Sequence, residues 1–498
     1  MNFKAFLLFI FFTLPVFSQE QKVNIQGYVF LDRNGNGQFD KNERGLRKVF
    51  LSDGKQIFET NRRGKFRAQV ERGRSLFVII PNGYKSQRDA WYINIPTGEN
   101  NKNSKKINFA LEKHKALKKY NFLAIGDVQV DSDEELKMAG NTILEEISNI
   151  NDYEFSLYLG DLVNDDPKLL NPIKELFNQT DKPYKTIYGN HDRHIDGTPF
   201  QSSSYRDNFG PPTYAFFKNN TLFIALNSIF PVGKYGYEGR YKERHLDFVK
   251  NVIQLADKHQ LIIISQHIPL KWMKNKKELL ELLDIENEVL FITAHTHSVI
   301  RYFYPRKSGL TDIQELVAGT TSGNWWTGQR NYKGIPLALM KDGSPRGYFK
   351  IKVNKNQYEF EFKGVQKEEN DQFNYWAGEL EANKVPVTID KENSELLINF
   401  FAGSDKSEIK LYVNDTLIGD MKQRKLQDPF VKKIKRLQKE KLYPNALSRR
   451  APYLSTPTDH IWSKELPYEK MNDLNKIRVV IKDPFLPEYS KTFYIWKK

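Results

Sequence analysis

Five segments between residues 120 and 300 each end in side chains that can bind a metal ion. An apolar run is followed at once by carboxylates, carboxamides or imidazoles, namely Asp127 and Gln129, Asp161, Asn190 with His191 and Asp192, His267, and His295 with His297. Oxygen and nitrogen donors of these kinds are common ligands of divalent cations. A single ending of this kind is more often a turn or a structural histidine, whereas five in one segment predict a metal site.

The surrounding elements predict how these side chains come together. Apolar runs at 121–125, 155–159, 185–188, 222–226, 261–265 and 289–294 indicate buried strands, and residues 133–150 and 242–259 have helical periodicity. This alternation predicts a layered α/β domain with strands between helices. Side chains at the carboxyl ends of its strands share one edge of the sheet. Gly126, Gly160 and Gly189 precede the ligands and would allow sharp turns there.

The order of the motifs resembles that of the calcineurin-like metallophosphoesterases. That family carries D-x-H, G-D-x-x-D, G-N-H-D/E, a lone His after a strand, and G-H-x-H, matched here by residues 127–129, 160–164, 189–192, His267 and 294–297. The flanks look like a bacterial subgroup with a β-sandwich on either side of the catalytic core. The resemblance implies a four-layer α-β-β-α core that hydrolyses phosphate monoesters or diesters.

The resemblance also implies two divalent metal ions, Mn, Fe, Mg or Zn, with defined ligands. Asp127, Gln129, Asp161 and His297 would hold the first ion, and Asp161, Asn190, His267 and His295 the second, so that Asp161 bridges them. Two such cations about 3.5–4 Å apart can clamp the attacking and leaving oxygens of an in-line displacement and activate a water. His191 would stabilise charge on the phosphate or protonate the leaving group. Asp192 would orient its neighbours or cap a helix.

Three positions depart from the family pattern. Gln129 stands where the family has a histidine, and its harder, neutral amide oxygen favours Mn²⁺, Mg²⁺ or Fe over Zn²⁺. Asn164 replaces a carboxylate behind the ligands, and Asp165 is the candidate to take its place. Ala294 replaces the glycine of G-H-x-H. These changes leave open a catalytically weak binding module as one alternative function.

A second metal motif lies near the N-terminus, in DRNGNGQFDKNE at residues 32–43. Asp32, Asn34, Asn36, Gln38, Asp40 and Glu43 occupy the six ligand positions of an EF-hand-type loop, Gln38 through its backbone carbonyl. Gly37 occupies the position where that loop turns sharply. The motif predicts a structural Ca²⁺ that stiffens the loop, and the alternative is a hairpin turn without metal.

The whole chain divides into four predicted parts. Residues 1–18, with Lys4 before an apolar run at 5–17, resemble a signal peptide, which predicts an exported, periplasmic or extracellular protein without a transmembrane segment in the mature chain. The alternative is a single membrane anchor. Short aromatic and β-branched runs predict a β-sandwich over 19–115, with a connection at 101–119, and a C-terminal β-sandwich-like domain over 321–498. The catalytic domain spans 118–320, and the absence of cysteine excludes disulfides.

The expected partner is a small or polymeric phosphate ester bound by a monomer. The net charge is +15, and the basic segment 421–450 has a helical stripe of Phe430, Ile434 and Leu437 that would face a core. A nuclease or phosphodiesterase acting on a polyanion is therefore an alternative, although such a segment is more often a solvated face.

Trp325 and Trp326 could stack on a substrate or pack between domains, and Arg330, Arg346 and Tyr348 could bind its anion.

Overall fold

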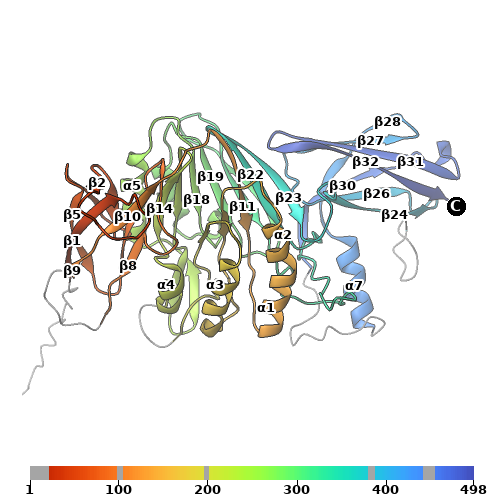
Figure 1. Cartoon of the computed structure of the whole chain (residues 1–498). Coiled ribbons are helices and arrows are strands. Elements are labelled where there is room, and N and C mark those ends of the chain that lie inside the picture. Colours follow the sequence, from red (N-terminus) through yellow and green to blue (C-terminus); the bar gives the residue numbers. More distant parts are fainter. Residues whose placement is uncertain (1–21, 98–104, 196–200, 379–386, 441–454) are drawn as a thin grey trace, which may run out of the picture.

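The computed structural model describes residues 22–97, 105–195, 201–378, 387–440 and 455–498 (Figure 1). The predicted signal peptide, 1–18, lies outside the described residues. In Figure 1 the N-terminal strands, the central α/β part and the C-terminal strands follow one another across the molecule. No helix in the described ranges is long and apolar enough to cross a membrane.

The central part contains two sheets. The first has the order β13 (Tyr184–Thr186), β12 (Ser156–Tyr158), β11 (Lys119–Ile125), β22 (Gly347–Asn354), β23 (Gln357–Gly364). The second has the order β14 (Tyr214–Lys218), β15 (Thr221–Ala225), β18 (Ile262–Ser265), β19 (Val289–Thr293), β21 (Ile313–Ala318), β20 (Val299–Tyr304). Phe122 and Phe155 both meet the ring of Phe223 edge to face, with centroids 5.4 and 5.3 Å apart, so the sheets pack face to face. The parallel strands are buried on both faces, which explains their unbroken apolar runs.

Strands β22 and β23 belong to this core. We predicted from the sequence that they belong to the C-terminal domain. Instead, β22 pairs antiparallel with β11, from Lys119↔Asn354 to Ala124↔Phe349, and β23 pairs with β22. An antiparallel edge strand can pair with a parallel sheet even when the two segments are far apart in the sequence. The alternating pattern of such a strand does not indicate the strand with which it pairs. The chain therefore returns to the first sheet after completing the second.

Helices cover the central sheets. They are α1 (Asp133–Ala139), α2 (Glu145–Ser148), α3 (Leu170–Asn178), α4 (Ser203–Phe209), α5 (Glu243–Val252) and α6 (Lys276–Leu282), with 3-10 turns at Pro167–Leu169, Ile253–Leu255 and Leu270–Trp272. The helix expected at 133–150 is interrupted by a π turn at Gly140–Leu144. In Figure 1, α1 to α4 lie together on one side. The predicted mixed α/β core is confirmed, and its four-layer form stays a prediction.

The N-terminal part forms two further sheets. One joins β2 (Arg44–Gly45), β1 (Lys22–Leu31), β10 (Phe109–Lys113) and β7 (Tyr84–Lys85), with β5 (Lys65–Glu71) and β9 (Lys105–Lys106) also on β1. The other has the order β4 (Ile57–Glu59), β3 (Phe50–Ser52), β6 (Ser75–Ile79), β8 (Tyr92–Asn94). Part of the expected connection at 101–119 is therefore strand, because β10 pairs in parallel with β1. Residues 98–104 lie outside the described residues.

The C-terminal part also contains two sheets and a helix. Their orders are β24 (Phe373–Ala377), β26 (Glu395–Phe400), β30 (Pro457–Glu465), β29 (Lys422–Gln427), and β25 (Thr388–Ile389), β32 (Leu486–Lys497), β31 (Leu474–Asp483), β27 (Glu408–Val413), β28 (Thr416–Asp420). A 3-10 turn lies at Tyr468–Lys470. In the central part, β16 (Ile229–Val232) and β17 (Gly236–Gly239) form a separate two-stranded hairpin. The sandwich form of both flanks stays a prediction.

The basic segment contains strand β29 and then helix α7 (Pro429–Lys439). Val431 and Ile434 of α7 form a small cluster with Leu339, and Phe430 packs against it. The apolar stripe therefore faces a core as expected, and the lysines between these positions are mostly exposed. The rest of the segment, 441–450, lies outside the described residues.

A buried carboxylate starts α7 and joins it to the core. Asp428 accepts hydrogen bonds from the Val431 amide at 2.9 Å and from the Asn399 side chain at 2.8 Å. Asn399 also donates to the carbonyl of Asp342 at 2.9 Å. Gly343 lies against this carboxylate, where a Cβ would come within 2.2 Å of it. Burial raises the pKa of Asp428 to about 7.

The raised pKa predicts a pH dependence of stability. The folded chain keeps the Asp428 proton up to about pH 7, whereas the unfolded chain releases it near pH 4. The stability of the wild type should therefore fall by about 3 kcal/mol between those pH values relative to Asp428→Asn, which keeps the cap. Urea unfolding of both proteins across this range measures the difference, with Asp405→Asn on an exposed loop as the control. Parallel curves for wild type and Asp428→Asn would contradict the prediction.

Candidate metal centre

Four of the predicted ligands have left-handed backbone conformations. The φ angles are 44° at Gln129, 47° at Asp161, 70° at His295 and 55° at His297. Residues other than glycine rarely adopt this region, and each instance costs about 1–3 kcal/mol unless the surroundings fix it. Their concentration at neighbouring strand ends indicates a functional site, because each bend turns a polar side chain toward the same space.

The glycines before the ligands serve two different purposes. Gly160, with φ 93°, makes the sharp turn that the sequence predicted. Gly126 and Gly189 do not have positive φ angles and are required by close packing instead. A Cβ on Gly126 would lie 1.8 Å from the Gly319 carbonyl oxygen, and a Cβ on Gly189 would lie 2.2 Å from Oδ1 of Asp161. The backbone at these two positions presses directly against the site.

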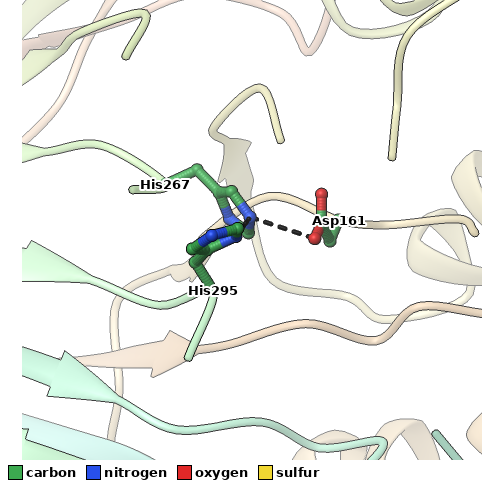
Figure 2. Close-up of side chains that lie close together, drawn as sticks. All are labelled: Asp161, His267 and His295. Carbon is green, nitrogen blue, oxygen red and sulfur yellow. Dashed lines mark hydrogen bonds and ion pairs between the residues drawn. The ribbon is translucent and has the colours of Figure 1, made fainter. Parts of the chain in front are cut away.

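Asp161, His267 and His295 form one compact group of potential ligands (Figure 2). Nε2 of His267 lies 3.0 Å from Oδ2 of Asp161 and 3.1 Å from Nδ1 of His295. Asn190 joins them, since its Oδ1 lies 3.2 Å from the same Nε2. His267 Nδ1 lies 2.8 Å from the Leu159 carbonyl, to which it donates, so its Nε2 is left to face the group.

The charges in this group are strongly coupled. Burial opposes ionisation of Asp161, but the neighbouring His267 and His191 hold its pKa well below its usual range. Burial would also lower the pKa of His267, and Asp161 outweighs this and raises it to about 9. Burial, together with His267, lowers the pKa of His295 to about 3. Without a cation, a protonated His267 therefore balances Asp161, while His295 offers a neutral ring nitrogen.

A second group lies beside the first and contains two unpaired oxygens. Among the described residues, the buried atoms Asp127 Oδ2 and Gln129 Oε1 have no hydrogen-bond partner. Gln129 is held by its Nε2, which donates to Asn164 at 3.2 Å, so its oxygen is left free. His297 donates from Nδ1 to the Gly323 carbonyl at 2.5 Å, and its Nε2 lies 3.4 Å from Asp127 Oδ2. Unpaired buried oxygens are costly unless a ligand satisfies them, so this donor set fits a cation.

His191 lies at the edge of both groups. Its amide donates to Oδ1 of Asp161 at 2.8 Å, and its Nδ1 lies 2.8 Å from Oδ1 of Asp165. Burial favours the neutral ring, but Asp161 and Asp165 outweigh this and raise the pKa of His191 to about 9. Asp165 therefore contacts His191, whereas Asn164 contacts Gln129.

The Asp192 carboxylate accepts hydrogen bonds from backbone amides and not from the imidazole of His191. It is fully buried, and its carboxylate accepts hydrogen bonds from the amides of Leu162 at 2.8 Å, Val163 at 3.2 Å and Gly189 at 2.9 Å. These amides belong to the loops that carry Asp161 and Asn190. Asp192 therefore fixes the two loops against each other.

The adjacent tryptophans have different surroundings. Trp326 is buried, donates from Nε1 to the Val128 carbonyl at 3.0 Å, and lies under Arg346, whose guanidinium is 5.0 Å from the ring centroid. Trp325 is partly exposed and packs on the ring of His297, with centroids 4.4 Å apart. Trp326 thus packs inside the protein, and Trp325 lines the site.

The other predicted anion-binding residues lie away from the ligands. Tyr348 donates to Glu146 at 2.9 Å, and Arg330 pairs with Glu134 at 2.6 Å. Arg330 and Arg346 line a cavity of about 730 Å³ between the core and the C-terminal strands. The structure therefore does not bring Arg330, Arg346 or Tyr348 together with the strand-end ligands.

The sequence did not indicate two aromatic residues that lie at the site. Tyr237 on β17 and Trp272 after β18 both meet the ring of His295 edge to face, with centroids 6.3 and 5.6 Å away. Both side chains are exposed. Neither lies in a motif, and the one available signal was that Trp272 follows His267 by five residues in the same loop.

The predicted calcium loop folds around its own carboxylates. Asp32 is buried and accepts hydrogen bonds from the amides of Gly35 at 2.7 Å and Gly37 at 2.9 Å, and both glycines have positive φ angles. Both Asn34 and Asn36 donate to Asp40 at 3.0 Å. Glu43 accepts from the amides of Arg33 and Asp40, while Gln38 donates its amide to Asn36. This geometry alone does not identify a metal, so calcium binding stays a prediction.

Three family models match segments of this sequence. The model of the calcineurin-like phosphoesterases matches residues 120–299, that of their N-terminal domain residues 33–114, and that of their C-terminal domain residues 315–489. No curated protein matches the sequence.

The structural likenesses are distant. A purple acid phosphatase from yellow lupin (Lupinus luteus) seeds is 11% identical, with 65% of this chain and 69% of that chain covered and a TM-score of 0.35. A metallophosphoesterase from Sphaerobacter thermophilus is 13% identical, with coverages of 49% and 87% and a TM-score of 0.24. Vps29 from Chaetomium thermophilum is 12% identical, with coverages of 49% and 97% and a TM-score of 0.24.

The family assignment rests on the three models, which follow one another along the chain in the order of the three parts of the fold. The C-terminal model begins at residue 315 and so also covers β22 and β23 of the core. The clustered Asp and His side chains supply the metal ligands that such chemistry needs. The chain belongs to the calcineurin-like phosphoesterases, as a multi-domain member, and is a metal-dependent hydrolase of phosphoric ester bonds.

Proposed function

We propose that this protein is an exported phosphoesterase that hydrolyses phosphate monoesters or diesters with two adjacent metal ions. The observation that carries the two-ion proposal is the pair of unpaired buried oxygens, Asp127 Oδ2 and Gln129 Oε1, next to the separate group around Asp161. One ion would satisfy the group of Asp161, His267 and His295 alone and would leave the other two oxygens buried without a partner.

The proposed ligands divide into two sets that share Asp161. Asp127, Gln129 and His297 would complete one set, and Asn190, His267 and His295 the other. When bound, the ions supply Lewis acidity to the ester and acidify a water molecule. In the metal-free chain Asp161 and Asp165 raise the pKa of His191 to about 9. The imidazole would serve as the proton donor to the leaving oxygen. Asp192 and Asn164 position the loops and the Gln129 amide.

The wider organisation is proposed on the same basis. A four-layer α-β-β-α catalytic core would span residues 118–364, so that β22 and β23 are included, between an N-terminal sandwich over 19–115 and a C-terminal sandwich from 365. A structural Ca²⁺ at 32–43 would stiffen the first sandwich, and residues 1–18 would direct export. In the described part of the basic segment, the apolar stripe of α7 packs against Leu339 and the lysines mostly face solvent. This is the arrangement of an ordinary solvated helix face and does not by itself favour a nuclease.

Removal and return of metals tests the proposal. Dialysis against a chelator should abolish hydrolysis of 4-nitrophenyl phosphate and bis(4-nitrophenyl) phosphate, and Mn²⁺ or Fe²⁺ should restore it better than Zn²⁺. The variant Gln129→His should shift this preference toward Zn²⁺, because imidazole is the softer ligand. Gln69→His, on exposed β5, is the matched control and should change nothing. Metal analysis should find two ions per chain at the site.

Two results would count against the proposal. Full activity after chelation would contradict a metal mechanism. A single bound ion per chain at full activity would contradict the two-ion arrangement and leave the unpaired oxygens unexplained.

A further inference from the structure

Exposed apolar side chains gather at the rim of the metal centre. Among the described residues, Val232 is 47% exposed, Tyr235 67%, Tyr237 36% and Trp272 49%, whereas most large apolar side chains are buried. The first three lie on the β16–β17 hairpin and the fourth on the turn after β18. We name these four residues the aromatic rim. A concentration of exposed apolar surface beside a site indicates an apolar partner.

The aromatic rim is fixed to the metal ligands. Arg193 is 6% exposed and joins the two: its Nε donates to the Asn190 carbonyl at 2.7 Å, and its terminal nitrogens donate to the carbonyls of Tyr235 and Gly236, both at 3.1 Å. Tyr237 and Trp272 also meet the ring of His295 directly. A molecule held on the rim is therefore held at a constant position relative to the ligands.

Exposed cationic side chains neighbour the rim, whereas the acids Asp161 and Asp165 of the metal centre lie near Tyr237. Lys234, Arg240, Lys271 and Lys274 are exposed around it, and Glu238 is the acid among them, paired with Lys274 and, at 3.7 Å, with Arg240. The group keeps a net positive charge. Tryptophan and tyrosine with flanking lysine and arginine are the residues that proteins place at the headgroup level of a bilayer, where each cation near an anionic surface contributes about 1 kcal/mol.

We propose that the aromatic rim docks the enzyme on an anionic lipid surface and that its substrate is a phosphate ester carried by a lipid. The proposal rests on the proposed phosphoesterase function and names the substrate class of the same site. A soluble ester bound at the metals would reach Tyr237 and Trp272 but would leave Val232 and Tyr235, at the hairpin turn, in water. A lipid surface covers all four and brings its headgroups to the ligands.

Vesicle sedimentation tests the docking. The protein should bind vesicles of phosphatidylcholine mixed with phosphatidylglycerol more tightly than vesicles of phosphatidylcholine alone. The double variant Val232→Ser/Tyr235→Ser should bind the mixed vesicles about tenfold more weakly, because two apolar side chains are lost. The matched control is Leu417→Ser/Tyr494→Ser, which removes an aliphatic and a tyrosine side chain, both 51% exposed, from the C-terminal strands. It should bind like the wild type.

A comparison of two substrates tests the assignment of the ester. Hydrolysis of phosphatidic acid in vesicles, divided by hydrolysis of 4-nitrophenyl phosphate in solution, should fall about tenfold in the rim variant and stay constant in the control. Equal vesicle binding by the rim variant and the wild type, or an unchanged ratio, would overturn the inference. Absence of vesicle binding, with a raised KM of Trp272→Ala for aryl but not alkyl phosphates, would overturn it in favour of a soluble aromatic ester. Absence of hydrolysis of either ester with every metal would instead refute the proposed function.

Discussion

Asp161→Asn is expected to lower kcat/KM for a phosphate ester by about 10³-fold or more, the scale on which removal of a central catalytic group acts. The Asp161 carboxylate is the one group shared by both proposed sets of ligands. It accepts from the His191 amide at 2.8 Å and faces His267 at 3.0 Å. A neutral amide keeps the volume but loses the charge that would hold the two proposed cations together and that raises the pKa of His191.

The measurement combines steady-state kinetics with metal analysis of the purified variant. Bound metal should fall together with activity, and cooperative thermal unfolding should be retained. Asp405→Asn on an exposed loop serves as the control and should behave as wild type. A variant that keeps more than about one tenth of the activity would show that Asp161 does not have this role.

Asp483→Asn is expected to destabilise the protein by about 3–5 kcal/mol, the usual cost of leaving a buried charge without its partner. The side chains of Arg301 on β20 and Asp483 on β31 are fully buried and form a bidentate pair, with N–O distances of 2.8 and 3.0 Å. Arg301 also donates to the Ala402 carbonyl at 3.1 Å. The pair joins the core to the C-terminal strands, and β20 begins at Val299, close after His297. Loss of the pair should therefore also loosen this proposed metal ligand.

Urea unfolding and limited proteolysis measure this loss. Glu281→Gln removes the exposed pair of Lys307 and Glu281, whose side chains are 79% and 63% exposed, and should cost under about 1 kcal/mol. Arg301→Met/Asp483→Leu should recover much of the lost stability, because neither charge is then left alone. Equal effects of Asp483→Asn and Glu281→Gln would show that the buried pair carries no special weight.

The placement of the ligands was predictable because it is local. Each of Asp127, Asp161 and His267 follows an apolar run that indicates a buried strand, and side chains at the carboxyl ends of parallel strands gather at one edge of their sheet. We expected these strand ends to share the edge of a single sheet, whereas Asp127 and Asp161 follow strands of the first sheet and His267 follows a strand of the second. The pairing of β22 with β11 was not predictable, since it joins segments more than two hundred residues apart and depends on which edge is vacant. The sequence indicated that strands lay there but not to which sheet they belonged.

The direction in which a side chain points was harder to predict than the position of its residue in the fold. Asp192 follows His191 in the chain, yet its carboxylate turns to the amides of Leu162 and Gly189. Tyr237 reaches His295 from a hairpin whose position is set by Arg193, a contact with no periodic pattern. Long-range hydrogen bonds of buried side chains determine these details, and composition and spacing do not encode them.

The left-handed conformations of Gln129, Asp161, His295 and His297 limit which amino acids evolution or a designer can place there. Valine, isoleucine and threonine are disfavoured there by their branched Cβ atoms. Glycine, asparagine, aspartate and histidine tolerate the conformation best, and Gln129 shows that an unbranched side chain also fits. A saturation library at these positions should therefore recover folded proteins from a narrow set of residues. A variant with a different metal preference must therefore use one of these few amino acids at each position.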